Sequence, residues 1–393
     1  MTRSPSDTRF AAFCFASFLL SLAYGATFLL SLLMTSLGGN ERDAGQVFAV
    51  TMVSTLAAVL GSGHMMQRWG AGRSVAFGAG CLVVASLGFG LVTQLGAALW
   101  LCGLVLGIGW GVFYTLGPIM VAAMIEPARR THCFALLSGS MLTGIGSGPL
   151  AGKVAGHFGL PVQSAFMCAA VAALLGGVYF WRLGRAQGVA PQRVQLSVPA
   201  AWQVLRSKSA LSLLMVGLGG AIFGGLGSFQ TSYAKSLGLD YSLFFLSFMG
   251  AAICCRLFIA GWVVRRDPLA CSAVLTTLML IAVVGFGEWV HDSLGYGLTA
   301  ALLGVGYGLN YSVINGLAAN EAPPGLTAQA LLLFSLSYFV GVFGFPFLAG
   351  RLIAQGGVHG MLLYVGSIAM LIWLLSVGRW VSGRLGGSQG VES

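Results

Sequence analysis

Charged residues are scarce in this chain. Only 8% of its 393 residues are Asp, Glu, Lys or Arg, whereas 57% are hydrophobic, and the mean hydropathy is +0.88. A soluble domain of this size carries about three times that share of charge. The chain has too little polar surface to dissolve in water, so lipid must be its main solvent. The net charge of +10 is divided among short clusters between apolar runs, which argues against nucleic acid as a partner.

Acidic side chains are missing from the centres of the apolar runs. All ten lie in loops, tails or the ends of predicted helices: Asp7, Glu41, Asp43, Glu126, Asp240, Asp267, Glu288, Asp292, Glu321 and Glu392. Carriers that couple to protons commonly use a buried carboxylate that titrates. The pattern argues against the usual proton antiport and leaves Glu126 and Glu321 as the remaining candidates.

Cysteine pairs and catalytic constellations are also missing. The eight cysteines show no CxxC spacing, so neither zinc nor a disulfide framework is indicated, and we expect no cofactor. No Ser/His/Asp or carboxylate pair stands at membrane depth, which argues against a membrane enzyme. The spacing of Met120 and Met124 and the run His64-Met65-Met66 leave a copper carrier as a minor alternative.

Long apolar stretches dominate what remains. A spanning helix needs about 20 apolar residues. The sequence predicts an all-α membrane protein with twelve such helices, near 10–35, 44–66, 74–94, 96–124, 132–156, 161–182, 209–232, 241–264, 268–287, 294–318, 327–354 and 358–382. They form two six-helix halves, 1–182 and 209–393, joined by a cytoplasmic linker at 183–208.

The distribution of basic residues predicts the orientation. With both termini in the cytoplasm, 15 of the 20 Lys and Arg lie on the cytoplasmic side, and only Arg42 and Lys235 lie outside. The fifteen are Arg3, Arg9, Arg68, Arg73, Arg129, Arg130, Arg182, Arg185, Arg193, Arg206, Lys208, Arg265, Arg266, Arg379 and Arg384. This bias follows the positive-inside rule. It predicts a multi-pass protein of a bacterial inner membrane with both termini cytoplasmic.

Internal repeats support the two halves. Residues 106–115 read LGIGWGVFYT, and residues 303–312 read LGVGYGLNYS, at an offset of 197. Residues 149–153 read PLAGK, and residues 347–351 read FLAGR, at an offset of 198. Repeats of this kind are typical of secondary transporters.

The loop after the second predicted helix resembles a signature of the major facilitator superfamily. Gly63, Arg68 and Gly70 match the family's pattern Gly-x-Leu-x-Asp-Arg-x-Gly-Arg-Lys, and Arg73 lies nearby, but Gln67 replaces the usual Asp. The resemblance implies the major facilitator fold, with a glycine turn and arginines that contribute to gating. The substitution implies a weakened charge lock between the halves.

The second half carries a shorter copy of this signature. Gly261 and Arg266 match it, whereas Arg265 stands in the position of the Asp. An ordinary positive-inside loop is the alternative interpretation of both copies.

The helix predicted near 132–156 resembles a motif of the family's antiporter branch, whose members mainly export drugs and metabolites. The motif residues are Gly144, Gly148, Pro149 and Gly152. Glycines at every fourth position allow close helix packing, and Pro149 introduces a bend. The arginine that drug exporters usually carry four residues before Gly107 is replaced by Gly103.

Arg256 lies roughly midway along the helix predicted at 241–264. A guanidinium costs at least ~2.5 kcal/mol at such depth, so it needs a partner. No acid lies at comparable depth, and arginine suits carboxylate or phosphate groups. The sequence therefore predicts an anionic substrate at Arg256. The resemblance to some organic-anion carriers of the superfamily implies Arg351 as a second contact. The alternative is that Arg256 reaches the cytoplasmic surface.

The resemblance also implies a cavity lined by the first, fourth, seventh and tenth helices. The candidate substrate-binding residues there are Tyr24, Trp110, Tyr114, Tyr307, Asn310, Tyr311 and Asn315. Two i, i+4 aromatic pairs correspond across the repeat and share one helix face each. Aromatic packing is the competing explanation.

These patterns predict a secondary active transporter of a small organic solute, in which two halves rock around a central site. The first hypothesis is export, by antiport, of a metabolite, drug or siderophore-like compound. The alternative is uptake or exchange of an organic anion through Arg256. The expected partners are the solute, a proton or counter-substrate, and the lipid bilayer, with the single chain as the working unit.

Overall fold

The computed structural model describes residues 5–124, 130–186, 197–259, 263 and 265–389. Its described residues are helical apart from short connections, and no strand occurs among them. The chain divides into two compact units. The first contains residues 1–195, 228–232 and 346–354, and the second contains 196–227, 233–345 and 355–393.

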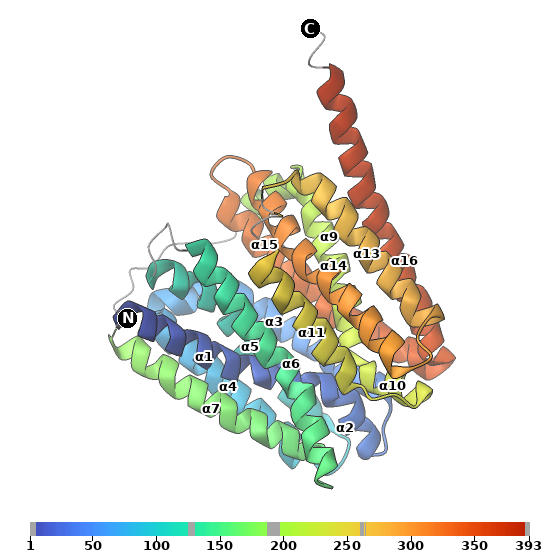
Figure 1. Ribbon diagram of the computed structural model, residues 1–393. Helices are drawn as coiled ribbons and strands as arrows, with labels where there is room; N and C mark the ends of the chain where they lie inside the picture. Colours follow the sequence, from blue (N-terminus) through green and yellow to red (C-terminus); the bar gives the residue numbers. More distant parts are fainter. Residues whose placement is uncertain (1–4, 125–129, 187–196, 260–262, 264, 390–393) are drawn as a thin grey trace. The chain divides into compact units, whose positions relative to one another are not determined.

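The first half of the chain forms the helices coloured blue to green in Figure 1. They are α1 (Pro5–Gly25), the 3₁₀ turn η1 (Ala26–Leu29), α2 (Leu30–Ser36), α3 (Glu41–Trp69), α4 (Ala71–Leu91), α5 (Ala97–Met124), α6 (Arg130–His157) and α7 (Gln163–Ala186). The change from α1 to η1 follows Tyr24, whose carbonyl accepts a hydrogen bond from the Thr27 hydroxyl at 2.6 Å. Such side-chain bonds compete with regular helix bonding and bend a helix.

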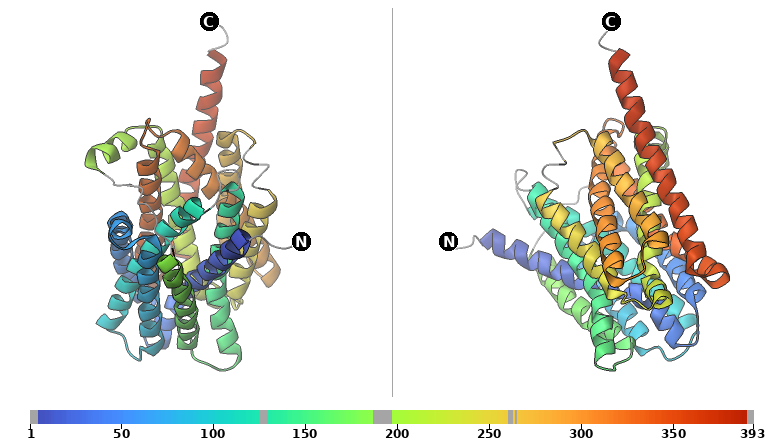
Figure 2. Two further views of the ribbon diagram at one scale, coloured as in Figure 1. Left: turned by 90° about the vertical axis from the view of Figure 1, so that its left-hand side faces the viewer. Right: turned by 45° about the vertical axis from the view of Figure 1, so that its right-hand side comes forward.

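The second half repeats this series. It consists of α8 (Val198–Leu205), α9 (Ser209–Ser228), α10 (Gln230–Leu237), α11 (Ser242–Phe258), α13 (Pro268–Glu288), α14 (Ser293–Asn320), α15 (Thr327–Phe339), the π-helical turn η3 (Val340–Gly344) and α16 (Phe345–Gln389). Helix α16 joins two predicted helices at Gly357, whose φ of 70° breaks the helical geometry. Its C-terminal part extends beyond α13 and α14 in both views of Figure 2.

The described helices account for the predicted membrane crossings. Ten of them are long and apolar enough to span a bilayer. One of these ten, 327–384, covers the two predicted helices that meet at Gly357. Helix α11 adds a shorter apolar helix. The prediction of an all-α membrane protein is confirmed, and the described helices are consistent with twelve crossings. The chain is a multi-pass membrane protein.

Equivalent glycines of the repeated ten-residue segment pack in the same way in each half. A Cβ on Gly107 of α5 would overlap the carbonyl oxygen of Thr51 in α3, and one on Gly304 of α14 would overlap that of Phe248 in α11. Phe248 follows Thr51 by 197 residues, which is the offset between the two glycines. The repeat therefore records a close helix contact made twice.

The middle glycine of each segment makes a second matched contact. A Cβ on Gly109 would lie 2.6 Å from the carbonyl oxygen of Gly78 in α4, and one on Gly306 would lie 2.8 Å from that of Leu275 in α13. The contacted residues again differ by 197. Each of α5 and α14 is thus fixed between two neighbours by glycines one turn or less apart.

Candidate functional site

The first half holds two of the predicted aromatic residues in one stack. The ring of Tyr24 in α1 lies 4.3 Å from that of Trp110 in α5, nearly parallel at 12°. Both are buried, with 2% and 1% of their surface exposed. Tyr114, one turn further along α5, contacts Trp110 at 5.8 Å and remains half-buried. Offset stacking of this kind adds about 1 kcal/mol beyond area burial, so the pair joins α1 firmly to α5.

The second half holds a matching stack. The ring of Phe223 in α9 lies 5.1 Å from that of Tyr307 in α14, again at 12°. Tyr307 follows Trp110 by 197 residues, and its hydroxyl donates to the Tyr338 hydroxyl of α15 at 3.4 Å. Tyr311, one turn further on, is half-buried and contacts Tyr338 edge-on at 5.3 Å. The structure therefore brings Tyr307 and Tyr311 into one aromatic cluster with Tyr338.

Asn310 lies on a different side of α14. Its Oδ1 accepts a hydrogen bond from the Ser272 hydroxyl of α13 at 2.9 Å, and Ser272 lies 3.1 Å from the Ser376 hydroxyl of α16. Asn310 is 3% exposed, whereas Asn315, the other predicted amide, is half-buried. The contacts of Asn310 are those of an interhelical packing residue rather than a member of the aromatic cluster.

Arg256 lies in the last turn of α11, and residues 260–262 and 264 of the helix predicted at 241–264 lie outside the described residues. It is about 21 Å along the helix from Ser242 at 1.5 Å per residue. Its Nε donates to the carbonyl oxygen of Gly308 in α14 at 3.2 Å, and the side chain is half-buried. This bond holds the guanidinium against the repeated segment of α14, one turn from Gly304.

The residues predicted to contribute to gating in the first half lie at, or a few residues before, the turn between α3 and α4. Gly70 joins α3 to α4 with φ of 81°, a value that favours glycine. Arg68 and Arg73 flank it and are exposed, and Gly63 lies inside α3. In the second half Arg266 is exposed, whereas Gly261 lies outside the described residues.

The predicted glycine stripe of α6 packs on the first helical segment. Added Cβ atoms would overlap Phe18 at Gly144 and Gly25 at Gly148, and would lie 2.5 Å from Leu29 at Gly152. Pro149 stands within α6. The stripe is a packing seam that lets α6 approach α1 closely.

Four acidic residues of the described chain cap helices or pair with a base. Asp43 completes a capping box at the start of α3, and Asp267 and Asp292 cap α13 and α14. Both carboxylate oxygens of Glu321 accept from Nη2 of Arg379, at 2.6 and 2.7 Å. Glu126 lies outside the described residues. Within the described part, no three His, Cys, Asp or Glu side chains gather as a metal site.

The sequence model of the Major Facilitator Superfamily matches residues 13–346. The chain belongs to this superfamily. It is a membrane transporter, which agrees with the resemblance seen in its loop and helix motifs. No curated protein sequence matches the chain.

Solved transporters share its fold. A human organic anion transporter, MFSD10 (TETRAN), is 16% identical with a TM-score of 0.71, covering 95% of this chain and 100% of its own. The nucleoside transporter NupG is 14% identical with a TM-score of 0.77, covering 94% and 99%. A POT family transporter in complex with 5-aminolevulinic acid is 14% identical with a TM-score of 0.74, covering 94% and 95%. At these identities the likeness concerns the fold alone.

Sequence reasoning missed two members of the aromatic clusters and one ion pair. Phe223 follows Tyr24 by 199 residues, so the repeat could have indicated it if the offset was allowed to differ by two residues from 197. Tyr338 has Met141 at the equivalent position and gave no repeat signal. The pairing of Arg379 with Glu321 joins residues 58 apart and required the arrangement of α14 and α16.

Proposed function

We propose that the protein is a secondary active carrier that exports a small amphipathic organic solute by alternating access of its two halves. One observation carries this proposal: each half presents an aromatic stack at repeat-equivalent positions, Tyr24 on Trp110 and Phe223 on Tyr307. Aromatic walls with a few polar groups suit an amphipathic ligand.

Polar groups next to these stacks supply the proposed specificity. Tyr114, Tyr311 and Asn315 are half-buried and lie one or two turns from the stacked rings. A phenol or amide that keeps some access to a ligand can exchange a hydrogen bond with it, whereas the stacked rings give shape. We therefore assign substrate contact to these three residues and support of the wall to the stacks, and we assign Asn310 to packing.

Export as the direction rests on the α6 motif. Gly144, Gly148, Pro149 and Gly152 resemble the antiporter branch, and their packing on α1 fits a segment that moves as one body with that helix. Asp43, Asp267 and Asp292 cap helices and Glu321 is held in an ion pair, and these roles support exchange with a counter-substrate over exchange with a proton.

An organic anion is the second candidate substrate, and Arg256 favours it. The guanidinium is half-buried, and its Nε is fixed on Gly308, one residue from Tyr307 of the aromatic cluster. An arginine held in this way is suited to a carboxylate or phosphate. Arg351, the other basic residue considered from the sequence, lies over the ring of Phe347 at 3.9 Å.

Transport into proteoliposomes tests the proposal. Purified protein is reconstituted with an imposed proton gradient, or with internal counter-substrate, and uptake of a panel of labelled solutes is followed. We expect saturable transport of an aromatic or amphipathic solute that counter-substrate accelerates. Acceleration by the proton gradient alone would refute the exchange mechanism, and absence of transport for every amphipathic solute would refute the substrate class.

Two variants separate the two candidate substrates. Arg256→Gln should abolish transport of an anion and spare a neutral solute, whereas Tyr311→Leu should weaken both. Arg384→Gln and Tyr364→Leu are matched controls, because Arg384 is exposed near the C-terminus and Tyr364 is 56% exposed on α16. Equal loss of both solutes in Arg256→Gln would assign that arginine to structure.

The cytoplasmic location of both termini and a bacterial inner membrane are part of the same proposal. The 15-to-2 division of basic residues supports this orientation. Labelling with a membrane-impermeant thiol reagent tests it: a cysteine placed at Arg384 should react only in inverted vesicles, and one at Lys235 only in intact cells. The reverse pattern would refute the orientation.

A further inference from the structure

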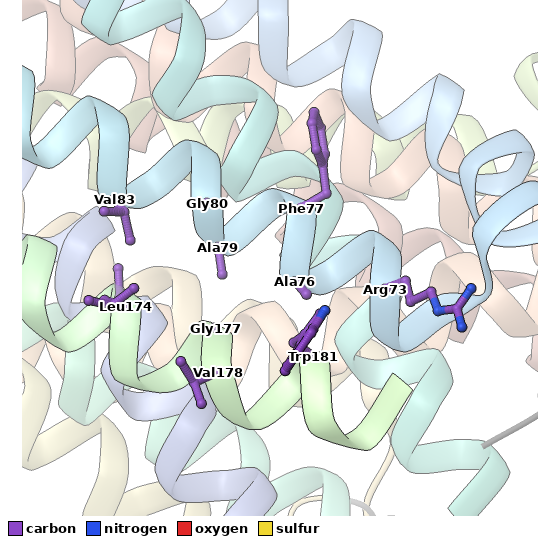
Figure 3. A pocket seen from close by; sticks show the side chains of 11 residues that line it. Arg73, Ala76, Phe77, Ala79, Gly80, Val83, Leu174, Gly177, Val178 and Trp181 are labelled. Carbon is purple, nitrogen blue, oxygen red and sulfur yellow. The ribbon is translucent and has the colours of Figure 1, made fainter. Parts of the chain in front are cut away.

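An apolar groove runs between α4 and α7 on the exposed surface of the first half (Figure 3). Its volume is about 310 Å³, and a second hollow of about 290 Å³ shares Val83 and Leu174 with it and continues along the same two helices. The floor is built of small residues, among them Ala76, Gly80 and Gly177. The groove therefore follows one helix pair over several turns.

Small residues at two levels create this groove. Gly72 at the start of α4 and Gly184 near the end of α7 approach so closely that a Cβ on either would overlap the other's backbone region. Further along, a Cβ added to Gly80 would meet nothing within 4 Å, so its place is open space. Close packing at one level and missing side chains at the other leave a hollow that is open to the bilayer.

Positive charge gathers at one end of the groove. Arg73 lines that end, and Arg182 and Arg185 lie in the last two turns of the antiparallel α7. Arg185 is placed 3.7 Å over the ring of Trp181, another lining residue. Arg73 and Arg182 are exposed and form no hydrogen bond or ion pair with any residue in the described part of the chain.

The depth of the groove matches one leaflet. From Ala76 to Leu87, the lining residues of α4 span about 16 Å at 1.5 Å per residue. One leaflet contributes about 15 Å of hydrocarbon. Trp181 and Trp69, 45% and 44% exposed, lie at the charged end, as aromatic residues do at the membrane interface.

We propose that this groove holds one anionic phospholipid. Its phosphate lies between Arg73 and Arg182, and one acyl chain fills the hollow over Gly80 and Gly177. Basic sites between transmembrane helices are suited to acidic head groups. Charge complementarity selects the head group, and the depth of the hollow accommodates the chain.

The equivalent place in the second half has different residues, which makes the proposed site particular to the first. Thr277 stands 197 residues after Gly80, and its hydroxyl accepts a hydrogen bond from the indole of Trp373 at 2.9 Å. Ala270 stands 197 residues after Arg73 and carries no charge. Arg379, 197 residues after Arg182, is bound to Glu321.

Native mass spectrometry of the purified full-length chain tests this site. The protein is titrated with phosphatidylglycerol or phosphatidylcholine of identical acyl chains, and the retained lipids are counted. We expect one phosphatidylglycerol to be held more tightly than the rest. Gly80→Leu should lower its affinity at least tenfold. Arg73→Gln should lower it about five-fold without changing phosphatidylcholine binding, because one basic residue near an acidic lipid contributes about that factor.

Two controls keep the outcome decisive. Gly366→Leu makes the same change at another helical glycine with open space, and Arg384→Gln removes an exposed arginine that lies 4.4 Å over Trp380. Both should retain the lipid as the unaltered protein does. Statistical lipid binding with no preferred stoichiometry would overturn the proposal, as would equal retention by Gly80→Leu and Gly366→Leu. If Gly80→Leu does not fold, continued preference for phosphatidylglycerol in the double variant Arg73→Gln/Arg182→Gln overturns it.

Discussion

The two halves of this transporter share the same close helix contacts at equivalent glycines and differ in the side chains between those helices. At the 197 offset, Phe113 and Val75 of the first half are replaced by Asn310 and Ser272 of the second. Phe113 and Val75 are fully buried among apolar neighbours, whereas Asn310 and Ser272 form a buried hydrogen bond. Both halves thus keep glycine where the helix backbones approach closely, whereas the side chains between the equivalent helices differ in polarity.

A second difference concerns one pair of arginines. Arg379 is bound by Glu321 and also donates to the Ser212 hydroxyl at 3.2 Å, whereas Arg182, its counterpart, is exposed. Met124 stands 197 residues before Glu321 and offers no carboxylate. The second half uses its arginine to join helices, and the first leaves it exposed, where we infer a lipid head group.

The shared glycine contacts can be broken in both halves by the same substitution. Gly304→Val and Gly107→Val should each cost on the order of 3 kcal/mol or more, because the new side chains overlap backbone in α11 and α3. The measurement is the fraction of monodisperse protein that survives heating. Gly250→Val is the control, since a Cβ there meets nothing within 4 Å. A loss of stability in only one of the two variants, Gly304→Val or Gly107→Val, would contradict the equivalence of the two contacts.

The arginine comparison predicts a somewhat smaller effect. Glu321→Ala should cost about 2 kcal/mol, because it leaves the largely buried guanidinium of Arg379 without its carboxylate. Arg182→Met should change the melting temperature little, since exposed charges contribute less than about 1 kcal/mol. The double variant Glu321→Ala/Arg379→Met should recover much of the loss. A double variant no more stable than Glu321→Ala would show that the unpaired Arg379 is not the cause of the lost stability.

The polar network of the second half predicts a loss of stability without a loss of affinity. Asn310→Ala should cost about 1 kcal/mol, the range found for interhelical hydrogen bonds in membranes. The KM of the folded fraction should not change, because Asn310 contacts α13 and not the aromatic cluster. Tyr311→Leu should show the reverse, with a raised KM and a nearly unchanged melting temperature. A raised KM in Asn310→Ala would return that residue to the substrate site.

These cases show how far the sequence alone could go. Hydropathy and the 197 offset predicted the helices and the repeat, because burial of glycine against backbone constrains the sequence at both copies. Asn310 was grouped with Tyr311 because both lie midway along one predicted helix, yet successive residues of a helix point about 100° apart. Only the packing of α13 decides which direction meets another helix.

The contact of Arg256 was harder to predict for a related reason. Hydropathy indicates one helix over 241–264, within which the structure describes α11 as far as Phe258. The position of a charge relative to a helix end decides whether it crosses the bilayer centre or lies toward one side. The Nε bond to Gly308 also depends on how α11 and α14 approach, which is a property of the pair.

The smallest expected effect concerns the hydrogen bond between Trp373 and Thr277, which lies in the second half at the place equivalent to the groove of the first. Trp373→Phe removes the indole donor to Thr277 and keeps most of the apolar contact, so it should cost only about 0.6 kcal/mol. Trp289→Phe, at a position 55% exposed, is the control and should cost less. The melting temperature in detergent measures the stability change. If Trp373→Phe also gained a tightly held phosphatidylglycerol, the bond alone would account for the difference between the halves. Because Ala270 and the paired Arg379 supply no free charge, we expect no such gain.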